Sequence, residues 1–297
     1  MNDERPKISI LLAVHNGADF LGEAIDSIVV QSYSNWELLV IDNASTDLTK
    51  AIAEKYVKKD ARIMYYFADQ KGKVNAYNLG FVHSKGDYIC FFAADDVLTV
   101  NSLEERLQGA RRKDSNCSTC LLKTFSDNPT HDGLVFPKDQ RQPNFSGGSI
   151  FFSRLLAEHF FPVPSILPNE DTWASLHLRA FGVNTHIEKI LYLYRIHPNN
   201  SYGYGLDFEE KRTKFLQRMH GYTLFYETYK DQKNLFVQTY VQHFVKGVEL
   251  ARQKDIFSLA IHRGLSVRDK AIFIFYSSEI LYKIRYKYFK FFSGLFN

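Results

Sequence analysis

Two adjacent acids, Asp95 and Asp96, follow closely on an apolar run that extends from Tyr88 to Phe92. The run is short and rich in strand-forming residues, which is typical of a strand buried on both faces of a sheet. Carboxylates at the exit of such a strand are costly unless water, a cation or a ligand's donors meet them. Ligands of open α/β sheets bind beyond the carboxyl ends of the strands, so this pair is the first candidate site. An ordinary turn is the alternative, because aspartate is common in turns.

Cys117 and Cys120 have the spacing of a CxxC motif. A redox motif of this kind opens a helix, and a zinc site needs further ligand pairs; the sequence offers neither context. We therefore interpret the spacing as coincidence. Three cysteines in 297 residues are too few for a secreted disulfide framework, so a reducing compartment fits the chain.

The elements that must position the acids alternate between strand and helix over the first hundred residues. Strands are predicted at 8–14, 38–41, 63–67 and 88–92, and helices at 21–29, 48–56, 73–83 and 102–112. Ser45 or Thr46 is expected to cap the second helix, and Asn101 with Glu104 the fourth. Repeated strand–helix units with short connections predict an α/β fold, a mostly parallel sheet flanked by helices.

The remainder of the chain divides near residue 204. Asn169 to Phe181 is predicted as a capped helix and Ile187 to Ile196 as a strand, whereas the pattern after residue 206 is helical. We expect a domain at 1–204 and a helical region at 205–297. The sequence contains neither a GxGxxG nor a GxxxxGK[ST] fingerprint, so a cation is expected to take over the neutralisation of phosphates.

The composition favours a folded protein with a substantial core, since 45% of the residues are hydrophobic and 15% are aromatic. The first residues lack the pattern of a signal peptide. No apolar run approaches the length of roughly 18 residues that suggests a membrane span. We therefore expect a cytoplasmic protein.

Seven separated segments together resemble the family 2 glycosyltransferases, which are inverting enzymes of the GT-A fold. They are ISILLAVHNG, QSYSNWELLVIDNASTD, GKVNAYNLG, GDYICFFAADDVL, GGSIFFSR, NEDTWASLHLRAFG and LYLYRIHPNNS. The segments occur in the family's order and cover residues 6 to 204. The resemblance implies transfer of one sugar from a nucleotide diphosphate sugar, with UDP-sugars first, to a hydroxyl of a glycan or lipid-linked acceptor. Bacterial surface polysaccharide synthesis is the implied setting, without a nucleic-acid partner.

The resemblance also implies a divalent cation, Mn²⁺ or Mg²⁺, which neutralises the leaving diphosphate. Asp96 is then the expected direct ligand, and Asp95 the ribose or water-mediated contact. His197 matches a family histidine near the metal or diphosphate, and an imidazole ligand would favour Mn²⁺; a hydrogen-bonded histidine at a strand end is the alternative. Arg195 would pair with the diphosphate, unless it is an ordinary surface cation.

Recognition of the base and ribose would fall to Val14, His15 and Asn16 after the first strand. Asp42 and Asn43 would contribute after the second strand, where the family more often has two aspartates. Asparagine still offers an acceptor to a ring N–H, but a neutral hydrogen bond replaces a charged one. The identity of the base is therefore open.

The segment before the central strand and a later glycine pair complete the implied donor site. Tyr77-Asn78 stands where relatives often have Arg-Asn. Asn78 therefore matches the family's donor-site asparagine, whereas the arginine that could contact a phosphate is replaced by Tyr77. Lys73, or its neighbour Lys71, is the expected substitute. Gly148, in the Gly147-Gly148 pair, would let the backbone approach the sugar closely, with a simple turn as the alternative.

Glu170 and Asp171 match the family's ED motif. An inverting displacement needs a carboxylate that takes the proton of the acceptor hydroxyl, and Asp171 is the expected base. Neighbouring helical residues do not share a face, so Glu170 is expected to orient the acceptor or a nearby cation. The alternative is structural, because acids after a capping Asn169 are stabilised by the helix dipole without any catalysis.

The formal net charge of +4 belongs to the C-terminal end, because cations outnumber acids by four between residues 268 and 297. Aromatic residues alternate with these cations, and Lys283, Lys287 and Lys290 fall on one helical face. Such a segment suits an anionic membrane surface, so peripheral attachment at the inner face of the cytoplasmic membrane is expected. A helical cap on the enzyme or a homo-oligomer contact is the alternative.

Two other functions compete with glycosyl transfer. A sugar nucleotidyltransferase would show a glycine-rich basic loop near the N-terminus, which His15-Asn16-Gly17 does not supply. A non-catalytic relative that binds nucleotide sugar or glycan stays open because of Asn43 and Tyr77. Processive polymerisation is disfavoured, since the sequence lacks the family's QxxRW motif.

Overall fold

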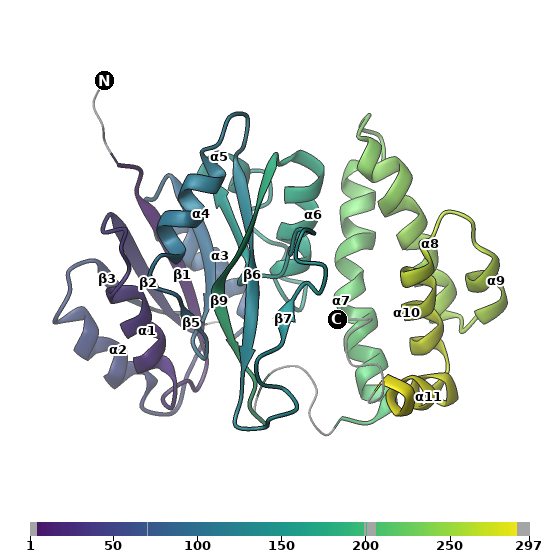
Figure 1. The fold of residues 1–297 in the computed structure, drawn as a ribbon, viewed down its shortest axis with the longest axis horizontal. Helices are drawn as coiled ribbons and strands as arrows, with labels where there is room; N and C mark the ends of the chain where they lie inside the picture. The colour runs from purple at the N-terminus through teal and green to yellow at the C-terminus, as the bar shows by residue number, and fades with distance from the viewer. Residues whose placement is uncertain (1–4, 70, 199, 201–205, 290–297) are drawn as a thin grey trace. The chain divides into compact units, whose positions relative to one another are not determined.

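The computed structural model describes residues 5–69, 71–198, 200 and 206–289, with side chains in the last helix described to residue 285. The chain forms two compact units, Met1–His197 and Pro198–Asn297 (Figure 1). The domain boundary expected near residue 204 lies outside the described residues and stays a prediction. The α/β class with a helical C-terminal region is confirmed.

The first unit is built on one nine-stranded sheet. Its N-terminal half is parallel in the order β3-β2-β1-β4 and consists of β1 (Ile8–Val14), β2 (Trp36–Asp42), β3 (Ile63–Phe67) and β4 (Tyr88–Ala93). These strands are apolar on both faces because helices cover both sides, as the continuous apolar runs predicted.

The other half of the sheet is mixed, which the strand–helix pattern did not predict. It contains β8 (Ile150–Ser153), β6 (Cys117–Phe125), β9 (Asn184–Arg195) and β5 (Val97–Leu98), with β7 (Val135–Phe136) paired to β6. Strands β6 and β9 are parallel, while the other pairs in this half are antiparallel. Both cysteines of the CxxC spacing are buried and unbridged in β6, so the motif is a coincidence of strand sequence.

Helices cover both faces of the sheet (Figure 1). The main apolar core joins one face to α1 (Leu21–Val29), α2 (Thr49–Val57) and α4 (Ser102–Ala110). The opposite face carries α3 (Lys73–His83) and α5 (Arg154–Ala157), on which α6 (Asp171–Phe181) packs. Gly80 lets α3 approach closely, because a Cβ there would lie 2.7 Å from Cδ1 of Ile41.

The predicted helix caps are wrong at three helix starts, since the N-cap residues of α2, α4 and α6 make no side-chain cap hydrogen bond. In the first turn of α4 the Leu103 N–H instead donates to Oε1 of Gln31 at 3.0 Å. Ser45 and Thr46 bind the loop after β1 instead: the Ser45 hydroxyl accepts from the Asn16 N–H, and the Thr46 N–H donates to Asn16 Oδ1. Asn101 makes no cap hydrogen bond, and Asn169 uses its amide to bind a side chain of the first turn. The cap predicted for α2 fails because Ser45 and Thr46 join the neighbouring loop after β1.

The second unit is helical. It comprises α7 (Phe208–Tyr229), a π-helical turn (Val237–Val241), α8 (Gln242–Arg252), α9 (Ile256–Ile261), α10 (Val267–Ser277) and α11 (Glu279–Phe289). Asp207 and Glu210 form a capping box at the start of α7. Helices α7, α8 and α10 pack together around an apolar core that includes Phe244 and Phe273.

Part of the basic aromatic tail belongs to this core. Phe273 is fully buried, and the ring of Tyr276 stacks on Phe215 with centroids 4.0 Å apart. The side chains of residues 286–289, and residues 290–297 altogether, lie outside the described part of the chain. The aromatic residues of α10 therefore bury apolar area within the helical unit, and the expected membrane contact of the tail stays a prediction.

Candidate functional site

The carboxyl ends of the parallel strands bring four loops to one edge of the sheet. The register pairs Val14 of β1 with Asp42 of β2, and Ala13 of β1 with Ala93 of β4. The loops that follow these strands therefore begin at the same level, as parallel pairing requires. Asp95 and Asp96, hereafter the sheet-edge pair, leave β4 at this edge.

Asp96 is held by the protein itself. Its carboxylate accepts from the Tyr192 hydroxyl at 2.6 Å and from the Arg195 backbone N–H at 2.8 Å. The residue is only 2% exposed. Burial, followed by the charge of Asp95, raises the pKa of Asp96 well above its ordinary value. These contacts tie the exit of β4 to β9, and they do not favour the expected role of Asp96 as the direct metal ligand.

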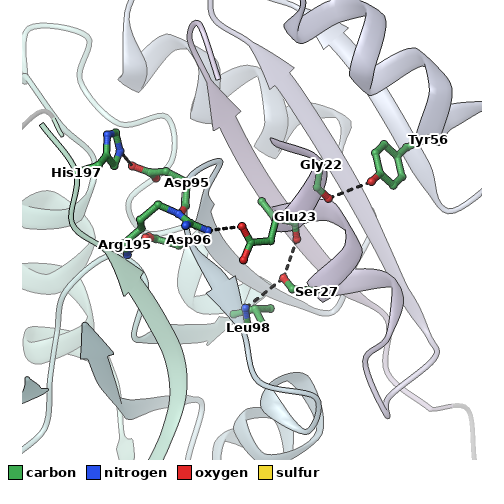
Figure 2. A network of polar contacts seen from close by, with 10 residues as sticks. Gly22, Glu23, Ser27, Tyr56, Asp95, Asp96, Leu98, Arg195 and His197 are labelled. Carbon is green, nitrogen blue, oxygen red and sulfur yellow. Dashed lines mark hydrogen bonds and ion pairs between the residues drawn. The ribbon is translucent and has the colours of Figure 1, made fainter. Parts of the chain in front are cut away.

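Asp95 is the more accessible member of the pair. Its Oδ2 lies 3.1 Å from Nε2 of His197, and the two side chains are 28% and 17% exposed. Figure 2 shows the two side chains pointing toward each other. The imidazole also packs on Phe20, with ring centroids 4.8 Å apart. A carboxylate and an imidazole thus meet at the sheet edge, where the sequence predicted both.

Arg195 has a structural role that the sequence did not reveal. Its guanidinium binds the Asp95 carbonyl oxygen at 2.8 Å and the Glu23 carboxylate (Figure 2). The same group lies over the rings of Phe20 and Phe125, at 4.6 and 4.3 Å from their centroids. The expected pairing with a diphosphate is not favoured, because these groups already surround the cation.

The predicted base site is a network of loop contacts. Asp42 is 1% exposed, and its carboxylate accepts from the Ser45 N–H and the Tyr65 hydroxyl, both at 2.8 Å. Asn43 accepts from the Gly72 N–H at 2.7 Å through its side chain. The Asp42 carboxylate therefore shapes the loop through these two contacts.

The loop after β1 lies beside these residues. Nδ1 of His15 lies 2.9 Å from the carbonyl oxygen of Asn43. Asn16 adopts a left-handed φ of 50°, which asparagine tolerates better than most residues. Val14 is buried, and its side chain packs in the main core; its predicted part in recognition stays a prediction.

The side-chain amide of Asn78 is engaged within the protein. Its amide nitrogen donates to the Val163 carbonyl oxygen, and its amide oxygen accepts from the Val163 N–H, each at 2.8 Å. This two-point contact fixes the segment after α5 to α3. Its contacts favour a structural role over donor binding, because both ends of the amide serve the same distant residue.

Glu170 and Asp171, hereafter the helix pair, stand at the start of α6. Glu170 is 2% exposed, and its Oε1 lies 3.1 Å from Nζ of Lys73. Its Oε2 is buried without a hydrogen bond. Burial raises the pKa of Glu170, and the ammonium group of Lys73 opposes this shift. A buried carboxylate with one unpaired oxygen is costly in a folded protein and points to a functional site.

Asp171 accepts from the Asn169 amide at 2.6 Å and from the Thr172 hydroxyl at 3.3 Å. A Cβ added to Gly147 would lie 3.3 Å from the Asp171 Cβ, so the glycine loop runs beside this carboxylate. Gly148 lies against the ring of Tyr192: a Cβ would be 2.4 Å from its Cζ. The loop before β8 thus reaches from the helix pair to the tyrosine that holds Asp96.

Tyr77 and Lys73 on α3 link the two acidic pairs. Tyr77 is buried; burial raises its pKa well above the ordinary value, and charges of the helix pair and the sheet-edge pair add to this effect. Lys73 in turn opposes the rise in the pKa of Asp96. Four carboxylates from β4 and α6 are therefore near enough to influence one buried side chain. Tyr192 and Tyr65 were missed from sequence, because an aromatic residue in an apolar pattern carries no signal of its polar contact.

The residues present fit a divalent cation only in part. Within the described residues, no group of three or more His, Cys, Asp or Glu side chains could hold a metal ion. Asp95 and His197 supply two donors 3.1 Å apart. Mg²⁺ and related ions in nucleotide enzymes are commonly bound by one or two protein groups, with phosphate oxygens and water completing the shell. The pair therefore fits a cation that arrives with a diphosphate.

The model of one protein family, "Glycosyl transferase family 2", matches residues 9–160, about half of the chain. An uncharacterized glycosyltransferase of Rickettsia typhi is 34% identical over 145 residues, which cover 47% of this chain and 43% of the relative. The putative teichuronic acid biosynthesis glycosyltransferase TuaG of Bacillus subtilis is 30% identical over 109 residues, covering 36% of this chain and 43% of TuaG. The alignments thus span less than half the length of these relatives.

Solved structures share the fold at low sequence identity. TarS of S. aureus in complex with UDP-GlcNAc has a TM-score of 0.63 at 17% identity, covering 93% of this chain and 82% of TarS. The mannosyltransferase PcManGT of Pyrobaculum calidifontis, in complex with GDP-Man and Mn²⁺, has a TM-score of 0.64 at 17% identity, covering 99% and 86%. These matches confirm the predicted GT-A fold.

Proposed function

The chain belongs to glycosyl transferase family 2, and from this premise we propose that it transfers a single sugar, with inversion, from a nucleotide diphosphate sugar. A UDP-sugar is the preferred donor in this proposal. The acceptor is a hydroxyl of a glycan or of a lipid-linked intermediate in bacterial surface polysaccharide synthesis. The name of TuaG supports this setting, since that relative is assigned to teichuronic acid biosynthesis.

One observation carries the proposal: the sheet-edge pair and the helix pair both lie near Lys73 and Tyr77. A displacement at an anomeric carbon needs charge control at the leaving group and a base on the opposite side. The two acidic pairs come from different elements, β4 and α6, and can serve these two ends separately. This division supports a transferase over a protein that only binds nucleotide.

At the leaving-group end, Asp95 and His197 would hold Mn²⁺ or Mg²⁺, and Asp96 would position this edge through Tyr192 and Arg195. This assignment gives the role of direct ligand to Asp95, whereas the sequence suggested Asp96. When bound, the cation neutralises charge on the departing diphosphate. The complex of PcManGT with Mn²⁺ supports the choice of ion.

At the acceptor end, a carboxylate oxygen of Asp171 takes the proton of the attacking hydroxyl. The hydroxyl oxygen then bonds to the anomeric carbon as the bond from that carbon to the diphosphate oxygen breaks. Glu170 is paired with Lys73, and this pair orients the lysine toward the region between the acidic pairs. Lys73 supplies the positive charge for the phosphates, because Tyr77 stands where relatives often have an arginine.

Hydrolysis of a donor panel tests the proposal. UDP-, dTDP- and GDP-sugars would be incubated with the full chain and Mn²⁺, because glycosyltransferases often release sugar to water. We expect turnover of one nucleotide class, with UDP first, and a loss of at least about 100-fold in Asp171→Asn when acceptor is supplied. Nucleotide-sugar binding without hydrolysis or transfer would instead favour the non-catalytic alternative.

We further propose peripheral association with the inner face of the cytoplasmic membrane. No helix within the described ranges is both long and apolar enough to cross a bilayer. Truncation before α10 would remove buried Phe273 from the helical core, so charge reversal is the better test. Lys283→Glu with Arg285→Glu should reduce sedimentation with anionic vesicles, and equal sedimentation would contradict the proposal.

A further inference from the structure

A second cavity lies within the helical unit, outside the candidate active site. Its volume is about 260 Å³, and its lining residues come from α7, α8 and the turn after α9: Tyr226, Gln242, His243, Val245, Lys246, Glu249 and His262. We call it the histidine cavity. Every lining residue belongs to one compact unit, so the cavity is complete within that unit.

Positive groups converge on this cavity. Burial lowers the pKa of His262, and the nearby charges of His243, Lys270 and Lys246 lower it further. Lys270 is held in place by donating to the Ala260 carbonyl oxygen at 3.1 Å. An anion that enters beside these groups would oppose the repulsion that lowers the pKa of His262.

The acid in the cavity wall does not cancel this charge. Glu249 is half-exposed and lies 3.0 Å from Nζ of Lys246 on the same helix, a spacing of three residues. An exposed ion pair of this kind is weak and exchanges readily with water. The other side chains of the wall that can carry a positive charge are His243, Lys246 and His262, so basic groups outnumber the single acid.

The His262 ring is oriented as a hydrogen-bond donor. Nδ1 of His262 accepts from the Gly264 N–H at 3.2 Å, so the proton of the neutral ring resides on Nε2. His243 lies edge-to-face beside it, with ring centroids 5.3 Å apart. A Cβ at Gly264 would lie 2.2 Å from Cγ of His243, so the glycine allows the turn to close over that ring.

A metal site is the competing explanation for two neighbouring histidines. Within the part of the chain that the structure describes, no third His, Cys, Asp or Glu joins them in a group that could hold a metal ion. A proton fixed on Nε2 of His262 and two nearby lysines also suit an anion better than a cation.

We propose that the histidine cavity binds a phosphate group, as a phosphate monoester or a diphosphate. The volume exceeds what one phosphate needs, and imidazole and ammonium donors match its oxygens. The source is either a free phosphate compound or the head group of a phospholipid. Helix α9 ends directly before His262, and its Phe257 and Ile261 are 74% and 60% exposed. Exposed apolar side chains beside the cavity favour including a phospholipid among the sources.

Titration of the full chain with inorganic phosphate and with inorganic pyrophosphate tests the proposal. EDTA is present, so that a cation at the proposed donor site does not contribute. The double variant His243→Gln with His262→Gln should bind roughly tenfold more weakly, because charge-assisted hydrogen bonds are lost. His220→Gln, on α7 and outside the cavity, is the matched control and should bind as the native chain does. Donor hydrolysis should be unchanged in both, which separates this proposal from the proposed function.

Flotation with vesicles distinguishes the sources. Phosphatidylcholine vesicles containing phosphatidic acid would be compared with vesicles containing phosphatidylserine at equal charge. Selective loss of phosphatidic acid binding in the double variant indicates a lipid source, whereas loss of free phosphate binding alone indicates a soluble one. If the double variant unfolds, phosphate-induced shifts of the His243 and His262 ring signals in the native chain replace it. Unchanged phosphate affinity, or binding of Zn²⁺ but not phosphate, would overturn the proposal.

Discussion

Nζ of Lys73 lies 3.1 Å from Oε1 of Glu170, which joins the first residue of α3 to the residue before α6. The ammonium group is half-exposed, whereas the carboxylate is 2% exposed. Through this pair the loop that leaves β3 is connected to the expected catalytic base, one residue further on. The relationship is invisible in sequence, where the two residues are 97 positions apart.

Lys73→Met should destabilise the chain in a pH-dependent way. Without the lysine, Glu170 is a buried charge with no partner, which costs about 1–3 kcal/mol near neutral pH. Its pKa is already raised above 4.5, so the folded state binds its proton more tightly than the unfolded state. The free energy of unfolding therefore falls as pH rises from the unfolded-state pKa of Glu170 through its raised folded-state pKa. The stability lost in Lys73→Met should be smaller at acidic pH, where Glu170 is protonated and neutral. Urea unfolding at several pH values measures it, and Glu170→Gln added to Lys73→Met should restore most of the loss.

Tyr192→Phe should lower the free energy of unfolding by about 1–3 kcal/mol, because the buried Asp96 loses its hydroxyl donor. Tyr66→Phe is a suitable control, since the Tyr66 hydroxyl lies 3.8 Å from the Met64 sulfur in a weak contact. Denaturant titrations of the two variants should differ clearly. Equal stability would show that the Tyr192 hydroxyl does not hold Asp96.

Gly148→Ala should disturb both ends of the site. The new methyl group would lie 2.4 Å from Cζ of Tyr192, and overpacking of this kind costs about 1–3 kcal/mol. Gly22→Ala is the matched control, because the nearest atom to its Cβ is the Tyr56 hydroxyl at an ordinary 3.6 Å. Thermal unfolding would report the difference, and an unaffected Gly148→Ala would mean that the loop shifts freely.

Substitutions of the two sheet-edge aspartates should affect different measurements, one of them nucleotide binding and the other stability. Asp95→Asn should weaken Mn²⁺-dependent nucleotide binding about tenfold or more with little change in stability, because a partly exposed carboxylate is lost. Asp96→Asn should mainly lower the free energy of unfolding. The new amide NH₂ group would face a donor, because the Tyr192 hydroxyl and the Arg195 N–H both donate to this side chain. Mn²⁺ titrations monitored by UDP binding, with EDTA as the metal-free reference, give the comparison. The opposite pattern would restore Asp96 as the direct ligand.

The strands and most helices were predictable from local pattern. β1, β3 and α3 match the predicted ranges because burial on both faces demands continuous apolar runs, and a helix covering a sheet demands apolar residues at helical spacing. The mixed half of the sheet was not predictable, since β8, β6 and β5 pair with strands far away in sequence. Pairing across such distances leaves no local signal.

The sequence by itself determined that acids stand at a buried strand's exit and at a helix start, and that the chain resembles one family. The tertiary structure decided which of the predicted site residues are engaged by other parts of the protein. Arg195, Asn78 and Asp42 are occupied by Glu23, Val163 and Tyr65, partners that only folding brings within hydrogen-bond distance. The physical reason is that a polar side chain satisfies whichever donor or acceptor the fold places beside it, and residue type alone does not specify that neighbour.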